Sequence, residues 1–120
     1  MAAFETRQEP QGLVITLGNP SALNDFRTNA FRDALFEVVR PIDHPHVAVN
    51  LGAIDYLASS GVAILIGLKR RIDAQQGKLV LFGVHPFVFD LLRSMKLTQY
   101  FTFTETEGDA LAALRPVPTA

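Results

Sequence analysis

The chain has 120 residues, of which 48% are hydrophobic and 19% are charged, and its formal net charge is −1. This length and composition indicate one globular domain over residues 1–120, and the charge balance excludes the basic field that nucleic-acid binding requires. The absence of cysteine excludes disulfides and thiolate metal sites. Because the N-terminus lacks a signal sequence and no apolar run approaches the roughly 20 residues of a membrane span, we expect a cytoplasmic protein without such a span.

The N-terminal third predicts a hairpin followed by a helix. Residues 4–8 and 13–17 are short β-rich runs on either side of a Pro-Gln-Gly turn. Helical spacing begins at Asp25, with Asp25 or Thr28 as the capping residue and Pro41 just beyond the helix end. The apolar face of this helix is expected to contain Phe31, Leu35, Val38 and Val39.

Two buried strands with a helix between them are predicted in the middle of the chain. Residues 47–51 are apolar on both sides, as in a parallel strand that is covered by helices, and residues 78–83 repeat this pattern. The intervening helix begins near Ser60, includes the basic trio at residues 69–71, and has Gly77 as its expected C′ residue. Its apolar positions are Val62, Leu65, Ile66 and Ile72.

The last third predicts a helix, a short strand and a final helix. Pro86 opens the first of these helices; its apolar face is expected to contain Val88, Leu91, Leu92 and Met95. Residues 101–103 form the strand, and residues 106–114 form a helix capped by Thr106. Strands separated by helices require right-handed crossovers, so the order predicts an α/β fold: a mixed four- to five-stranded sheet with about four helices packed on it.

Two serines stand where the middle strand gives way to a helix, in the sequence Ala58-Ser59-Ser60-Gly61. The first N–H groups of a helix have no intrahelical partners, and the helix dipole favours negative charge there. Such a position suits a helix cap, an anion site or a hydroxyl that accepts a phosphate group. Ser60 is the expected cap because it is nearer to the first helical residues.

Several segments occur in a recognisable order and spacing: Val49-Asn50-Leu51, Ile54-Asp55-Tyr56-Leu57, Ser59-Ser60-Gly61, residues 77–84, and Asp25 with Thr28. This order and spacing resemble the STAS family, which includes the anti-sigma factor antagonists. This resemblance implies a regulatory protein rather than an enzyme. Unphosphorylated antagonists bind an anti-sigma factor that is also a serine kinase. Phosphorylation of the first serine of the loop breaks that complex, and a PP2C-type phosphatase restores it.

The resemblance also implies which residues of this chain would act. Ser59 matches the phosphorylated serine, and the partner-binding surface would contain Asp25, Thr28, Ala58, Ser59, Ser60 and Gly61. Ala58 departs from the family pattern, because phosphorylated members commonly have Asp before the serine pair. This departure leaves an alternative open: a STAS interaction module without phosphoregulation, acting as an accessory subunit of a transporter or signalling assembly.

Other chemistries find little support in the sequence. Ser59 is not part of a G-x-S-x-G elbow, no phosphate-binding P-loop motif is present, and His44 and His46 have no evident third metal ligand. We therefore expect no catalytic residue, no cofactor and no metal. Phe87 and Phe89 lie partly outside the apolar stripe of their helix, and at least one of them is expected to pack in the core.

Overall fold

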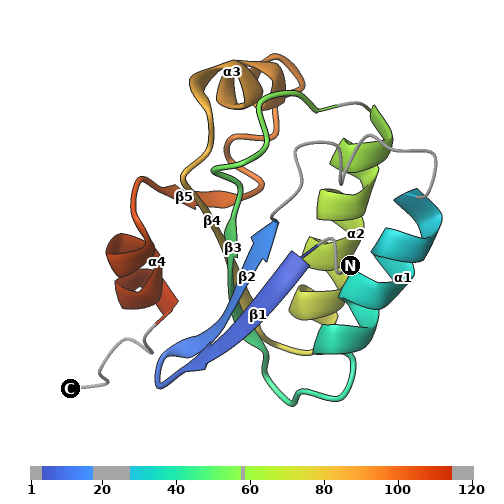
Figure 1. Ribbon diagram of the computed structural model, residues 1–120, viewed down its shortest axis with the longest axis vertical. Helices are drawn as coiled ribbons and strands as arrows, with labels where there is room; N and C mark the ends of the chain where they lie inside the picture. Colours follow the sequence, from blue (N-terminus) through green and yellow to red (C-terminus); the bar gives the residue numbers. More distant parts are fainter. Residues whose placement is uncertain (1–3, 18–27, 58, 115–120) are drawn as a thin grey trace.

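The computed structural model describes residues 4–17, 28–57 and 59–114, which form a sheet with helices on both faces (Figure 1). In chain order the elements are β1 (Phe4–Glu9), β2 (Gly12–Leu17), α1 (Thr28–Val39), β3 (His46–Asn50), α2 (Ser59–Ala74), β4 (Lys78–Phe82), α3 (Pro86–Ser94), β5 (Thr102–Thr104) and α4 (Glu107–Leu114). The predicted order of strands and helices is confirmed, and so is the predicted α/β class.

The five strands form one sheet in their sequence order, β1-β2-β3-β4-β5. β1 and β2 pair antiparallel as the predicted hairpin, and every later pairing is parallel. The sheet is therefore mixed, as the sequence predicted. Because β2, β3 and β4 run in the same direction, the segments that follow them all leave from one edge of the sheet.

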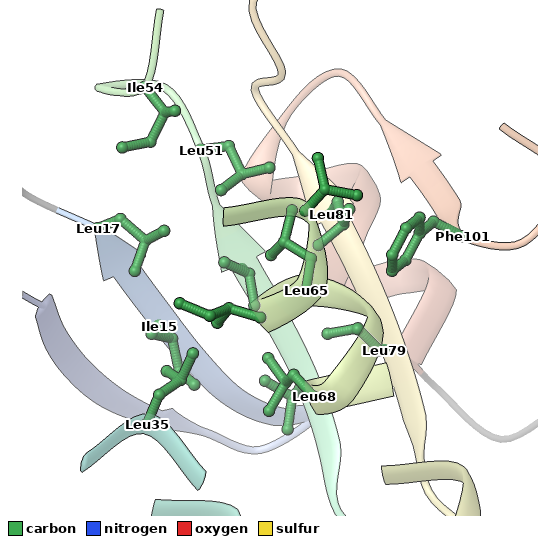
Figure 2. Close-up of a cluster of buried hydrophobic side chains, with 14 of the residues drawn as sticks. Ile15, Leu17, Leu35, Leu51, Ile54, Leu65, Leu68, Leu79, Leu81 and Phe101 are labelled. Carbon is green, nitrogen blue, oxygen red and sulfur yellow. The ribbon is translucent and has the colours of Figure 1, made fainter. Parts of the chain in front are cut away.

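Alternate residues of each strand face opposite helical layers. Ile15, Val49 and Leu81 are register neighbours, and they belong to the main core on the face that α1 and α2 cover. Figure 2 shows how Ile15 and Leu81 point with Leu65 and Leu68 of α2 into this core. The next residues along these strands, Val14, Ala48 and Val80, pack instead with Ala110 and Leu114 of α4. The unbroken apolar runs of the central strands thus reflect burial on both faces.

The packing of α1 against α2 depends on a glycine. A Cβ at Gly67 would come within 2.9 Å of Cζ of Phe36, so the missing side chain makes room for the Phe36 ring. The guanidinium carbon of Arg71 lies 4.6 Å from the centroid of the same ring, a favourable cation–π geometry. Arg71 therefore contributes to packing between the two helices.

Charged groups connect β1 to the start of α4. Arg7 of β1 donates hydrogen bonds from Nε to Oε1 of Glu9 and from Nη2 to Oε2 of Glu107, the first residue of α4. The bond to Glu107, followed by the bond to Glu9, raises the pKa of Arg7. Thr106 caps α4, because its Oγ1 accepts the N–H of Asp109 at 3.1 Å, as the sequence predicted.

α2 begins at Ser59 and continues past the basic trio to Ala74, in agreement with the predicted start near Ser60. Other details of the predicted elements differ from the structure. Met95 does not face the core: α3 ends at Ser94, Met95 is its C-cap, and 45% of the Met95 surface is exposed. Thr28 is already the first residue of α1, so it does not precede that helix as a cap would, and Asp25 lies outside the described residues. No helix within the described ranges combines the length and the apolar character that crossing a bilayer requires.

The end of α2 corrects the role that the sequence gave to Gly77. The residue in the left-handed conformation is Gln76, with φ 60°. The Gly77 N–H bonds to Ile72 O at 2.8 Å and the Gln76 N–H bonds to Asp73 O at 2.9 Å, which is the Schellman pattern with Gln76 at C′. Gly77 is required for space instead, because a Cβ there would lie 2.0 Å from the backbone oxygen of Pro45.

We predict that Gly77→Ala lowers the free energy of unfolding by about 2 kcal/mol, since a backbone carbonyl must move to admit the methyl group. Gly108→Ala is the matched control, because its Cβ would meet only Oγ1 of Thr106, at an ordinary 3.9 Å. Gly108 lies in α4, so the control is expected to be neutral or stabilising by about 0.5 kcal/mol. Urea denaturation measures both variants, and equal stability of the two would contradict the steric argument.

Candidate functional site

The predicted switch region lies at the edge of the sheet where the parallel strands end. The chain leaves β3 after Asn50, crosses this edge as residues 51–57 and enters α2, whose first residue is Ser59 (Figure 1). α1 also follows a strand that ends at this edge, so Thr28 and Ser59 both begin helices on the same side of the sheet. The topology therefore brings two of the predicted site positions to one end of the domain.

The segment between β3 and α2 is anchored by buried side chains at every third residue. Leu51 and Ile54 are fully buried and Leu57 is 3% exposed, and all three belong to the main core. Figure 2 shows Leu51 and Ile54 at the upper end of that core. The Ile54 N–H also bonds to Leu51 O at 3.0 Å, which closes a turn between the first two anchors. Residues 51–57 are thus held by the same core that holds the sheet.

A second set of contacts ties the start of this segment to the neighbouring strand. The Leu51 N–H bonds to Phe82 O at 3.0 Å, which extends the parallel ladder beyond β3. Oδ1 of Asn50 accepts the Gly52 N–H at 2.8 Å. Gly83 adopts a φ of +66°, and a Cβ there would lie 3.3 Å from the same Oδ1. Asn50 therefore fills the space between the two turns that follow β3 and β4.

The same pattern that buries three side chains directs the others to solvent. Gly52, Ala53, Asp55 and Tyr56 are exposed, and 57% of the Tyr56 surface is accessible. The sequence indicated this segment as a loop but did not show which of its residues face outward. The signal was present in the apolar residues at every third position, a spacing that is typical neither of a strand nor of a regular helix.

The first turn of α2 contains three of the predicted site residues. Ser59 is the first helical residue, Ser60 follows it, and Gly61 and Val62 are buried beneath this turn. A capping residue precedes the first helical residue, so the prediction that Ser60 is the cap is wrong. The cap position falls on Ala58, which lies outside the described residues. Unpaired N–H groups and the helix dipole make this end of α2 tolerant of an anion.

Another exposed aromatic side chain lies at the same end of the domain: Phe87, at the start of α3 after β4, is 64% exposed. Tyr100 is 36% exposed but lies before β5, where Nζ of Lys69 is 5.2 Å from its ring centroid. Phe89, by contrast, is only partly exposed and meets Phe103 edge to face, with ring centroids 5.2 Å apart. Neither Phe87 nor Phe89 belongs to the core of the described residues, so the expectation that at least one of them packs there is wrong. Within the described ranges, the two most exposed large apolar residues follow the carboxyl ends of β3 and β4.

Two of the histidines lie away from this site, and the third caps a helix. His44 and His46 line a hollow of about 210 Å³ at the opposite end of the strands, beside the turn between β1 and β2. His85 is the N-cap of α3, where its Nδ1 accepts the Phe87 N–H at 3.4 Å. No group of three or more potential metal ligands occurs among the residues that the structure describes.

Comparison with known proteins identifies what this arrangement resembles. A family model described as STAS domain matches residues 3–110. A putative anti-sigma factor antagonist from Thermotoga maritima shares 16% identity with a TM-score of 0.81, over 94% of this chain and 95% of that one. The anti-sigma factor antagonist SpoIIAA in its unphosphorylated form is 20% identical to this chain. The TM-score is 0.75, and the match covers 98% of this chain and 100% of that one. The phosphorylated form of the Bacillus cell fate determinant SpoIIAA shares 20% identity with a TM-score of 0.66, over 94% of this chain and 100% of that one.

We predict that Asn50→Ala lowers the free energy of unfolding by about 1 kcal/mol, because the Gly52 N–H loses its acceptor and the space beside Gly83 empties. Asn50→Asp keeps an acceptor oxygen at the same position and is the matched control. Urea denaturation measures the stability of both. If the aspartate variant loses as much stability as the alanine variant, the hydrogen bond to Gly52 is not what holds the turn.

Proposed function

The chain belongs to the STAS domain family, and on this premise we propose that it is an anti-sigma factor antagonist that is switched by phosphorylation of Ser59. In the unphosphorylated state it binds an anti-sigma factor with serine kinase activity, and phosphorylated Ser59 breaks that complex. A PP2C-type phosphatase resets the switch in the cytoplasm. The domain acts by binding, and it catalyses no reaction of its own.

The observation that carries this proposal is the position of Ser59. It is the first residue of α2 and follows a segment that is anchored by Leu51, Ile54 and Leu57. In this proposal the kinase approaches Ser59 where the anchored segment meets the start of α2. The fold likeness to SpoIIAA, which has been solved in both unphosphorylated and phosphorylated forms, supports the same assignment.

The physical effect of phosphorylation supports a switch at the interface. A phosphate adds roughly −1.5 to −2 charges and three acceptor oxygens. The unpaired N–H groups at the start of α2 accommodate that anion, so the domain remains folded. A partner surface that fits the serine hydroxyl is disrupted by the phosphate, because the phosphate is larger and its charge must be desolvated when the complex forms. The partner-binding residues around Ser59 in this proposal are Asp25, Thr28, Ala58, Ser60 and Gly61.

Ala58 favours a second candidate function. Members that are phosphorylated commonly carry Asp at this position, and Ala removes a carboxylate that a kinase would meet next to the serine. The second candidate is a STAS interaction module without phosphoregulation, acting as an accessory subunit of a transporter or signalling assembly. Stable binding to a partner that never transfers phosphate to Ser59 would select this candidate over the first.

The direct test is incubation of the purified protein with ATP and each anti-sigma factor-type serine kinase of the source organism. We expect one kinase to modify Ser59, as located by peptide mass spectrometry. Ser59→Ala is expected to abolish the modification, whereas Ser60→Ala retains it. Modification of Ser60 with Ser59 unchanged would contradict the assignment, and modification of neither serine by any kinase would remove the switch from the proposal.

We predict that Ser59→Asp weakens binding to that kinase at least tenfold, because the added carboxylate must be desolvated at the interface. The far-ultraviolet circular dichroism and the melting temperature are expected to stay close to those of the wild type, since the start of a helix tolerates an acidic side chain. Isothermal titration calorimetry measures the affinity. Unchanged affinity in a folded variant would contradict a switch based on charge.

A further inference from the structure

The segment that precedes Ser59 carries one carboxylate, Asp55. It is exposed, and it forms no ion pair within the described part of the chain. Most carboxylates on the helices, by contrast, form an ion pair with a basic side chain. Asp73 pairs with Lys69 at 2.7 Å, and Asp90 pairs with Arg93 at 3.2 Å. Asp55 is also the only charged residue between positions 51 and 58. The segment therefore presents one charge that no described residue neutralises.

The backbone that carries Asp55 is held in place before any partner arrives. Its neighbour Ile54 is fully buried, Leu57 is 3% exposed, and the turn at Leu51 is hydrogen-bonded to Phe82. Asp55 and Tyr56 occupy the exposed side of this anchored turn. Little ordering entropy is lost when such a surface is covered, which favours its use in recognition.

Chain geometry places Asp55 inside any interface that is centred on Ser59. The two residues are four positions apart, so their Cα atoms lie no more than about 14 Å from each other. A protein interface of ordinary size covers about 800 Å² on each partner, equivalent to a disc of about 16 Å radius. A protein that covers Ser59 from the exposed side therefore also covers or borders Asp55 and Tyr56.

Covering an unpaired carboxylate is unfavourable unless the partner supplies a compensating group. Resting on the proposed function, we propose that Asp55 and Tyr56 form the surface by which this chain selects its partner, and that the partner presents an Arg or Lys side chain to Asp55. Tyr56 supplies the aromatic contact area that is enriched at the energetic centres of interfaces. Phosphorylated members commonly carry a carboxylate at the position of Ala58, and in this chain Asp55 supplies the carboxylate of the loop instead.

The test is the affinity of Asp55→Asn for the kinase that phosphorylates Ser59, measured by titration calorimetry at low and at high salt. We expect binding to weaken at least tenfold at low salt, and we expect the salt dependence of binding to become shallower than that of the wild type, because a charge-assisted hydrogen bond is lost. Asp55→Glu keeps the charge and is expected to retain most of the affinity. Because Asp55 is exposed and has no described ion pair, the melting temperature is expected to stay unchanged.

Asp43→Asn is the matched control. It removes the same charge from an exposed position, with 93% of the side chain accessible, in the turn between α1 and β3 at the opposite end of the parallel strands. We expect its affinity to stay within twofold of the wild type. Equal affinities for the Asp55 and Asp43 variants would overturn the proposed surface and leave the Ser59 switch intact. A wild-type protein that neither binds any such kinase nor is phosphorylated by one would overturn both.

Discussion

The parallel pairing of β2, β3 and β4 is the constraint on which the remaining structure depends. Parallel strands with successive crossovers bring the segments after each strand to one edge, and burial on both faces requires apolar side chains at every strand position. Val47, Val49 and Leu51 continue one inward-facing series past the end of β3. The core thus extends directly into the segment that leads to Ser59, and the rigidity of that segment follows from the sheet.

This constraint separates what the sequence predicts from what it does not. Apolar runs and local caps are read directly from residue types, and for this reason the strand order, the start of α3 at Pro86 and the cap at Thr106 agree with the structure. The end of α2 was mispredicted because Gly77 is selected by a close approach to Pro45, a contact between residues that are far apart in sequence. Gln76 adopts the left-handed backbone conformation at C′, a position where glycine is the preferred residue.

The candidate site divides in the same way. The two-serine turn was identified from its place between a strand and a helix, Ser59 was selected within it by the resemblance to the STAS family, and α2 begins at that residue. Asp55 is exposed because its neighbours Ile54 and Leu57 are buried in the core. That core exists only when the sheet and α2 are packed together, so the sequence alone does not show the exposure of Asp55. Apolar residues at every third position carry this signal in the sequence, but their spacing is that of neither a strand nor a regular helix. The position of Ala58 and Asp25 lies outside the described residues, so their part in the surface remains a prediction.

The anchored segment also limits how phosphorylation of Ser59 would act. Moving residues 51–57 would expose Leu51, Ile54 and Leu57, and each buried aliphatic side chain contributes about 1.5–3 kcal/mol, or about 5–9 kcal/mol for the three. The interaction between an anion and the start of a helix is worth only about 0.3–1 kcal/mol at an exposed position, and it favours the existing helix. The interaction of a phosphate with the start of α2 is therefore too weak to offset the exposure of these side chains, and it stabilises the existing helix. The two phosphorylation states would present the same backbone surface with a different charge, so discrimination between them must come from the partner.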